Sequence, residues 1–355
     1  MRHRQARRKP RCLSSTAACS CDIVHAMRAL VYVAPESVEM RERPRPIPAA
    51  GEREVEIETT GICGSDMSGF LGHSPRRKPP LTLGHEMVGR LSDGRRVVAN
   101  PLISCGKCAR CISGAQNLCD SWRLLGLDRT EGSFAEFVTL PEGQLHEIPD
   151  SLPSERAVLA EPLANVVHLF RITAPLPFFR LAIVGAGTMG ALTYLGARLI
   201  GARDISVVDL NQERLNALKK MGVAAAVNAG DPAALREARA SGLSDFDVVI
   251  DASGSAAARQ MAFDLCRPGG QVVLLGMADQ RSEVDFVTSI RKEHRVVMSF
   301  AYTPADFQRA LALLIAGEVD LGPWTEKLPL EHGQRAFEKM TRAPGATLKM
   351  LLSVR

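Results

Sequence analysis

The sequence predicts an α/β protein of two domains, in which an irregular β-barrel precedes a doubly wound parallel sheet. Three observations support this fold class. The 355 residues exceed the usual size of one domain, and 46% of them are hydrophobic, which is enough for a sizeable core. Residues 27–150 contain short β-like runs separated by Pro and Gly. From about Phe178, strand-like and helix-like segments alternate.

Residues 1–26 form a basic leader. It holds six Arg or Lys residues against one acidic residue, Asp22, so it carries the whole net charge of +5. Its acid-poor composition is compatible with a transit peptide, but Met27 runs straight into a β-like segment, as a genuine start would. We favour a disordered leader from an over-extended start codon, and the transit peptide stays open.

The rest of the chain is electrically neutral, with 38 basic and 38 acidic residues. This balance gives no reason to expect a nucleic-acid or membrane partner. No apolar run reaches the ~18 residues of a membrane span, so we expect a soluble protein. Five of the six cysteines beyond the leader lie in ligand-like contexts, and only Cys266 does not. This usage indicates metal binding in a reducing compartment, the cytoplasm, rather than disulfides.

The first domain, residues 27–150, is expected to be mostly β-structure because helical periodicity is scarce there. Its β-like runs are Ala29–Val33, Glu54–Thr60, Arg95–Ala99 and Phe134–Leu140.

The second domain, residues 151–297, is expected to form a parallel sheet covered on both faces. Its predicted strands are Leu181–Val184, Ile205–Val208, Asp247–Ile250 and Gln271–Leu275, with helices ending near Ile200 and Met221. After Val297 the alternation stops. We therefore expect residues 298–355, with a helix at Pro304–Ala316 and a strand at Leu348–Val354, to return to the first domain.

Four cysteines are clustered with the spacing C-x2-C-x2-C-x7-C. This spacing lets a short loop fold four thiolates around one tetrahedral ion, which indicates a closed, structural zinc site. An iron–sulfur cluster is the competing interpretation, but ferredoxin runs use different spacings. The residues are Cys105, Cys108, Cys111 and Cys119.

A second group of potential ligands is spread over three segments. Cys63 lies in Gly-Ile-Cys-Gly-Ser-Asp, His85 and Glu86 lie in Gly-His-Glu-Met-Val-Gly, and Glu161 precedes Pro162. One thiolate, one imidazole and one carboxylate can bind zinc and leave a fourth position for substrate. Each residue alone also has an ordinary structural explanation, so only their combination carries weight.

These motifs resemble the zinc-containing medium-chain alcohol dehydrogenase family, in the G-H-E-x-x-G box and in the four-cysteine lobe about 20 residues beyond it. The resemblance runs from Met27 to the C-terminus. It implies a GroES-like barrel and a Rossmann domain. It also implies that Cys63 and His85 are zinc ligands, with Glu86 in or just outside the ligand shell. Glu161 matches the third ligand of the polyol and threonine dehydrogenases, so the chain resembles the polyol branch.

The resemblance also assigns a proton acceptor. The family's hydroxyl for this role lies two residues after the Cys ligand, which is Ser65 here. Liver-type members carry a relay His five residues after the Cys, where this chain has Ser68, so the outer proton route stays open, with His73 and His168 as alternatives. The basic run Arg76-Arg77-Lys78 is either a solvated loop or a site for an anionic substrate group.

A nucleotide site is predicted after the first strand of the second domain. The G-x-G-x-x-G motif there lets the backbone approach a pyrophosphate at a helix N-terminus. Asp209 ends the next strand, where it can accept hydrogen bonds from a ribose and repel a 2′-phosphate, so NAD is favoured over NADP. Arg214, on the helix that follows, is the residue that speaks for NADP, although it can also be an ordinary solvated charge. The motif residues are Gly185, Gly187, Thr188, Met189 and Gly190.

Together these parts predict an enzyme with two zinc ions per chain. It oxidises a secondary alcohol, polyol or cyclitol to the ketone by hydride transfer to NAD. A threonine-type amino-alcohol dehydrogenase would share every motif. A zinc-stabilised nucleic-acid-binding protein, using the basic leader, is the alternative from another class. By resemblance we expect a homodimer or homotetramer with a small-molecule substrate.

Overall fold

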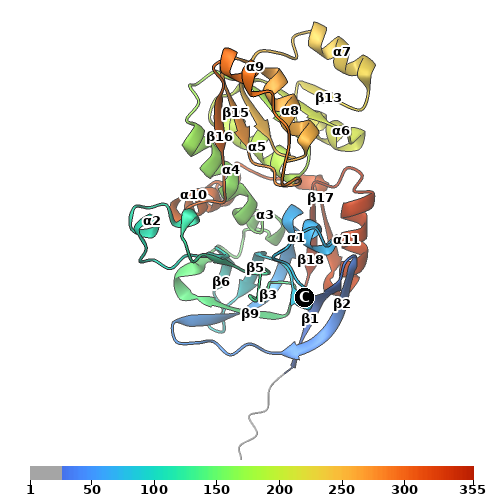
Figure 1. The fold of residues 1–355 in the computed structure, drawn as a ribbon. Coiled ribbons are helices and arrows are strands. Elements are labelled where there is room, and N and C mark those ends of the chain that lie inside the picture. Colours follow the sequence, from blue (N-terminus) through green and yellow to red (C-terminus); the bar gives the residue numbers. More distant parts are fainter. Residues whose placement is uncertain (1–25) are drawn as a thin grey trace, which may run out of the picture.

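The computed structural model describes residues 26–355, and the predictions for the leader lie outside the described residues. Figure 1 shows two parts: a β-rich part that holds the first strands and the C-terminal strands, and an α/β part above it. In the described part of the chain, no helix combines the length and the apolar character that a membrane crossing needs.

The β-rich part is built around one large sheet. Its strand order is β10-β6-β5-β3-β18-β17, and β9 adds to β3. A smaller sheet has the order β2-β1-β4, and β7 pairs with β8. The strands are β1 (Ala26–Ala34), β2 (Ser37–Pro44), β3 (Glu52–Gly61), β4 (Leu81–Thr82), β5 (Glu86–Arg90), β6 (Arg96–Ala99), β7 (Leu102–Ile103), β8 (Arg123–Leu124), β9 (Phe137–Pro141) and β10 (Leu145–Glu147).

Buried and partly exposed side chains alternate along these strands, and the buried ones fill the interior of the barrel. In β3, Val55 and Ile57 point into the core while their neighbours are partly exposed, as expected for a sheet with one buried face. Phe70 and Phe337 stack within this core, with ring centroids 4.8 Å apart. Phe70 belongs to α1 (Gly64–Phe70) and Phe337 to α11 (Gly333–Arg342), so distant parts of the chain share one core.

The α/β part contains a parallel sheet of six strands in the order β13-β12-β11-β14-β15-β16. This order is that of a Rossmann fold, and it reverses between β11 and β14, where such sheets bind nucleotides. The strands are β11 (Arg180–Val184), β12 (Arg203–Asp209), β13 (Ala225–Asn228), β14 (Phe246–Asp251), β15 (Cys266–Leu274) and β16 (Arg295–Met298). The helices are α5 (Thr188–Leu199), α6 (Gln212–Lys220), α7 (Pro232–Ala240), α8 (Ala256–Leu265) and α9 (Phe286–Arg291). The predicted fold class is confirmed.

The end of the chain lies in the first sheet. β18 (Lys349–Ser353) pairs antiparallel with β3, with Leu351 opposite Gly61, and β17 (Thr325–Pro329) pairs parallel with β18. In Figure 1 these red strands lie among the blue and green ones of the N-terminal half. The division of the chain at residues 150 and 297 stays a prediction.

One helix between the two parts was not predicted from the sequence. This helix, α4 (Ala160–Thr173), packs against both α5 and α10 (Pro304–Ile315), and α10 is the helix predicted at Pro304–Ala316. Most of α4 is buried. A helix covered on several sides has no polar face, so its periodicity is weak in the sequence.

One predicted strand starts later than expected. The run Phe134–Leu140 becomes β9 only from Phe137. The backbone N–H of Phe134 instead donates to the carbonyl of Leu83, outside the ladder between β9 and β3.

Candidate metal and nucleotide sites

Strand pairing brings the first two ligand segments together. β3 ends at Gly61, which lies opposite Glu86, the first residue of β5. Cys63 follows β3 directly and precedes α1, while His85 precedes β5. The backbone N–H of Cys63 donates to Asp66 Oδ2 at 3.1 Å, which fixes the turn into α1. Two segments that are separate in the sequence therefore place their side chains at the same end of the sheet.

Three predicted ligands form a tight group. The ligand atoms of Cys63, His85 and Glu86 all lie within 4.8 Å of one another, and His85 and Glu86 are almost completely buried. Glu161, in the first turn of α4, lies outside this group of three. It is nevertheless a neighbour, because burial raises its pKa while the charge of His85 opposes this rise and that of Glu86 adds to it.

Asp66 lies behind the imidazole of His85. Its Oδ1 lies 3.5 Å from His85 Nδ1 and 3.5 Å from Arg77 Nη2. Burial pushes the pKa of Asp66 up, but the His85 and Arg77 charges and the Cys63 N–H outweigh burial and lower it to about 2. A carboxylate behind a ligating histidine fixes the ring and its tautomer. Asp66 was not predicted as a site residue, although its position three residues after Cys63, next to a helix start, was an available signal.

Glu86 and Lys349 form a buried ion pair, and each side chain is 1% exposed. The Lys349 ammonium also donates to the carbonyl of Ile62 at 3.0 Å. Gly61 makes this arrangement possible, because a Cβ there would lie 2.2 Å from Glu86 Oε2. Oε2 of Glu86 thus has a cationic partner inside the protein.

Replacing Lys349 with Met is expected to lower the free energy of unfolding by about 3 kcal/mol, because it leaves a buried carboxylate without its partner. Chemical denaturation measures this loss. Lys349→Met combined with Glu86→Gln should recover most of it, because no buried charge is left unpaired. A double variant as unstable as the single one would contradict this role.

The charges of this site fit a bound cation. Burial lowers the pKa of His85, but the charges of Asp66 and Cys63 outweigh burial and raise it well above its usual value. Tyr302 adds a buried hydroxyl whose pKa is raised by burial and by Glu161. The acidic groups of Cys63, Asp66, Glu86 and Glu161 therefore interact here with the cationic side chains of Lys349 and Arg77 and with the imidazole of His85. A thiolate, an imidazole and a carboxylate within ligand reach are a donor set that suits Zn²⁺.

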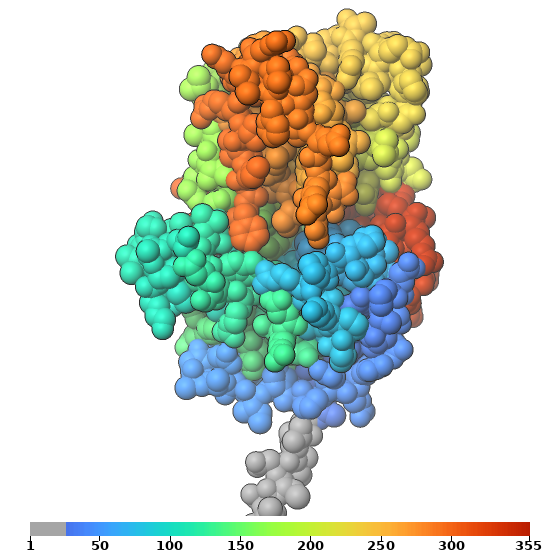
Figure 2. Space-filling model, in the orientation of Figure 1, coloured from blue at the N-terminus to red at the C-terminus, as the bar shows by residue number. Residues whose placement is uncertain are grey.

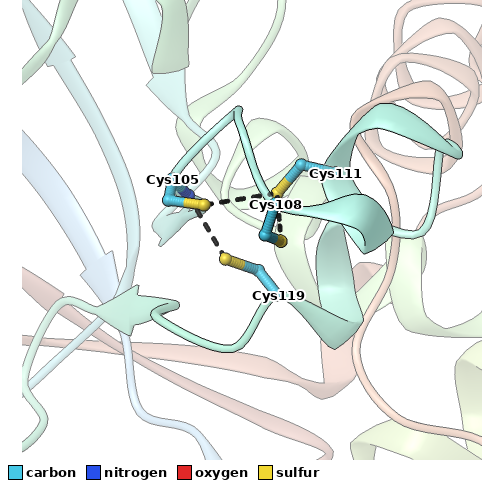
Figure 3. Close-up of side chains that lie close together, drawn as sticks. All are labelled: Cys105, Cys108, Cys111 and Cys119. Carbon is cyan, nitrogen blue, oxygen red and sulfur yellow. Dashed lines mark hydrogen bonds between the residues drawn. The ribbon is translucent and has the colours of Figure 1, made fainter.

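The four cysteines of the loop also lie together. Figure 3 shows the four side chains converging from one loop, with their sulfurs facing one another. Cys105 Sγ lies 3.9 Å from Cys111 Sγ, and Cys108 Sγ lies 3.5 Å from it. A tetrahedron with Zn–S bonds of about 2.3 Å has edges of about 3.8 Å, so the spacing fits zinc. The backbone N–H of Cys111 lowers the pKa of Cys108 to about 6, and that of Lys107 lowers the pKa of Cys105, whereas burial raises the pKa of Cys111 to about 11.

This loop lies at one side of the molecule, in teal in Figure 2. It contains α2 (Ala109–Ile112) and the short 3-10 helix Gln116–Leu118. Asn117 contacts the rest of the protein: its amide donates to the carbonyl of Phe300 at 2.8 Å and lies 3.5 Å from His168 Nε2. His168 in turn lies 2.8 Å from Asp306 through Nδ1. His168 thus belongs to a buried network between α4, α10 and the loop.

Two residues of the basic run Arg76-Arg77-Lys78 have partners within the protein itself. Arg76 forms an ion pair with Asp128 and stacks 4.2 Å above the ring of Trp122. Arg77 is buried, and its Nη2 donates to Ser65 Oγ at 3.0 Å. Lys78 is exposed. His73, the other alternative for the outer proton route, is exposed in the same loop.

The glycine motif lies at the carboxyl end of β11, where the strand order reverses. Gly187 precedes α5, whose first turn contains Thr188, Met189 and Gly190. Gly190 has no room for a side chain, because a Cβ would lie 1.8 Å from the carbonyl oxygen of Gly185. This close contact packs the helix start against the glycine turn, and the N–H groups of a first helical turn have no partner within the helix and can bind an anion.

Asp209, the last residue of the neighbouring strand β12, contacts the glycine motif. Its Oδ2 accepts the N–H of Ala186 at 2.5 Å and its Oδ1 that of Asn211 at 2.6 Å. Arg214 lies nearby, and its Nε donates to the carbonyl of Thr347 at 3.2 Å. The Thr188 hydroxyl donates to the carbonyl of Leu348, the residue before Lys349. The nucleotide motif and the metal-site sheet are therefore in direct contact.

Two family models match the chain. Residues 49–150 match the alcohol dehydrogenase GroES-like domain, and residues 188–316 match the zinc-binding dehydrogenase model. A curated relative, L-threonine 3-dehydrogenase from Chelativorans sp. (strain BNC1), is 31% identical over 335 residues, which cover 90% of this chain and 96% of the relative. The chain belongs to the zinc-containing medium-chain alcohol dehydrogenase family.

Further comparisons place this dehydrogenase in the polyol branch of the family. The sorbitol dehydrogenase of Bacillus subtilis (strain 168) is 30% identical, with 88% of this chain and 94% of the relative covered. A solved structure described as a short chain alcohol dehydrogenase from E. coli CFT073, in complex with NADH, has a TM-score of 0.84 at 26% identity, covering 92% and 99% of the two chains. A zinc-binding dehydrogenase from Sinorhizobium meliloti 1021, bound to NADP, has a TM-score of 0.82 at 28% identity, covering 93% and 99%.

Proposed function

We propose that this dehydrogenase oxidises a secondary alcohol, polyol or cyclitol to the ketone, with NAD as hydride acceptor. The observation that carries the proposal is the group of Cys63, His85 and Glu86, with Ser65 and Glu161 beside it. Zinc bound there would act as a Lewis acid that lowers the pKa of the substrate hydroxyl. Cys63 and His85 supply ligands, and the carboxylates of Glu86 and Glu161 complete the set.

The protein's own residues then have separate tasks. Asp66 holds the ring of His85, and Lys349 holds one oxygen of Glu86. Ser65 accepts the proton of the alcohol. The helix start at Thr188–Gly190 and the carboxylate of Asp209 hold the dinucleotide. Because the Thr188 hydroxyl bonds to the carbonyl of Leu348, the residue before Lys349, the helix start that would hold the dinucleotide lies against the sheet of the metal site, as hydride transfer requires.

A substrate panel tests the proposed reaction. The holoenzyme is incubated with NAD and, in turn, with polyols, cyclitols, phosphorylated sugar alcohols, threonine and simple primary alcohols, and NADH absorbance is followed. We expect the highest kcat/KM with a polyol or cyclitol. Turnover of threonine alone would replace the polyol assignment by that of an amino-alcohol dehydrogenase. Binding of DNA without any turnover would favour the nucleic-acid-binding alternative.

Asp209→Asn is expected to raise the ratio of kcat/KM with NADP to that with NAD by about 100-fold. The change removes the negative charge that repels a 2′-phosphate, while the shape of the side chain is kept. Arg214→Gln is the matched change on the neighbouring helix, and it should lower NADP use when it is combined with Asp209→Asn. An unchanged cofactor ratio in Asp209→Asn would contradict the proposed role of Asp209.

The second zinc and the assembly state complete the proposal. The sulfur–sulfur spacing of the four-cysteine loop supports a structural zinc, giving two zincs per chain. Cysteines that bind a metal rather than form disulfides suit the reducing cytoplasm. A homodimer or homotetramer is supported by apolar side chains exposed around α9 and β16, the last strand of its sheet, which can pair with a second copy. They are Met277, Phe286, Val287, Ile290, Val296 and Met298.

A further inference from the structure

Arg77 lies against the proposed proton acceptor. Only 6% of the residue is exposed, and its Nη2 donates to Ser65 Oγ at 3.0 Å. The same nitrogen lies 3.5 Å from Asp66 Oδ1. The aliphatic part of Arg77 crosses α1 at Gly69, where a Cβ would lie 2.4 Å from Arg77 Cδ. The absence of a side chain at Gly69 is therefore what lets the guanidinium reach Ser65.

This contact restricts what the serine hydroxyl can do. A hydroxyl has one hydrogen to donate and two lone pairs that accept. The guanidinium donates into one lone pair, and it cannot take up a proton because it stays charged at any working pH. One lone pair of Ser65 remains for the hydroxyl of a substrate, and the hydrogen of Ser65 must point to a third group.

During alcohol oxidation the proton therefore moves from the substrate to Ser65, and a proton moves from Ser65 to water. The O–H bond of the alcohol breaks and a new O–H bond forms on Ser65 Oγ, while the original hydrogen of Ser65 leaves to water. Ser65 is only partly buried, so water can reach it. The chain has Ser68 rather than the relay histidine of the liver-type enzymes, so no imidazole at that position directs the proton.

We infer that Arg77 is a positioning residue that holds the Ser65 hydroxyl as an acceptor for the substrate proton. This inference rests on the proposed role of Ser65. It also accounts for the small residue at position 69, where a side chain would displace the stem of Arg77. A purely structural role, in which Arg77 only neutralises Asp66, is the alternative that the experiment must separate.

A double-mutant cycle makes this separation, with Ser65→Ala, Arg77→Met and the double variant assayed on an alcohol that the holoenzyme oxidises. We expect Ser65→Ala to lower kcat by about 100-fold and Arg77→Met by about 10-fold, with KM changed by less than about threefold. When Arg77→Met is added to Ser65→Ala, it should change kcat by less than about twofold, because the hydroxyl it positions is gone.

Gly69→Ala provides an independent way to displace the Arg77 side chain. It leaves both Ser65 and Arg77 chemically intact, but its Cβ moves the arginine from its place. Its effect on kcat should match that of Arg77→Met, and it too should vanish when Ser65→Ala is already present. If Arg77→Met does not fold, Gly69→Ala and Arg77→Lys carry the test.

Arg96→Met is the matched control, because Arg96 is equally buried and pairs with Glu58 away from Ser65. Its effect on kcat should be the same in the parent enzyme and in the Ser65→Ala variant. Effects of Arg77→Met and Ser65→Ala that multiply would overturn the inference, since Arg77 would then act through Asp66 or the fold. An unchanged kcat in Ser65→Ala would instead reject the proposed role of Ser65 itself, and the inference with it.

Discussion

His85→Ala is expected to lower kcat by at least about 1,000-fold and to reduce the zinc content from about two ions per chain to about one. His85 supplies the only imidazole of the Cys63, His85 and Glu86 group, and the Asp66 carboxylate lies 3.5 Å behind its Nδ1. Its loss removes a zinc ligand and also the imidazole that interacts with the charges of Asp66 and Cys63. Several kcal/mol of transition-state stabilisation disappear with the Lewis acid, and each 1.36 kcal/mol is tenfold in rate.

Elemental analysis and steady-state kinetics on the same preparation measure both effects. His332→Ala is the control, because His332 is exposed and precedes α11, and it should keep both the zinc and the activity. A His85→Ala enzyme with full activity would show that the metal is held elsewhere. Loss of both zincs together would show that the two sites are not independent.

Cys119→Ser is expected to lower the melting temperature by at least about 10 °C and to remove the other zinc. Cys119 is buried, and its sulfur accepts backbone N–H groups of Cys105 at 3.3 Å and Ser121 at 3.4 Å. A loop of this length has little apolar core of its own, so metal binding supplies much of its folding free energy. Because Asn117 bonds to Phe300, the loosened loop should also disturb the segment just before Tyr302.

Calorimetry with zinc counting checks this prediction. Cys266→Ser is the matched control, since Cys266 is buried in the Rossmann core outside both ligand groups, and it should retain both zincs. A Cys119→Ser protein that melts like the parent would show that the loop is stable without its metal. Retention of two zincs would show that the four cysteines do not bind one ion.

The parts of the fold that the sequence predicts well are those with local signals. The strand Leu181–Val184, its glycine turn and the helix after it leave a periodic pattern, and they appear as β11 and α5. The four cysteines lie within one loop, so their spacing alone predicts that they meet. α4 was missed because it is buried on several sides, and β13 because its four residues are only partly buried.

The surroundings of the metal site could not be predicted because they are assembled from distant segments. Lys349 reaches Glu86 only because β18 pairs with β3, which in turn pairs with β5. A lysine within the apolar run Leu348–Val354 was the available signal, since a buried ammonium needs an anionic partner. Arg77 gave no local signal, because its contact with Ser65 depends on how its stem crosses Gly69.

The central claim is hydride transfer from the carbon of an alcohol to NAD at the site of Cys63, His85 and Glu86. The most direct measurement uses a polyol that the enzyme oxidises, deuterated at the reacting carbon, and analyses the NADH product by mass spectrometry and NMR. We expect deuterium on C4 of the nicotinamide, none at the carbonyl carbon of the ketone, and no labelled NADH from His85→Ala. Product NADH without deuterium, or labelled NADH at the parent rate from His85→Ala, would contradict it.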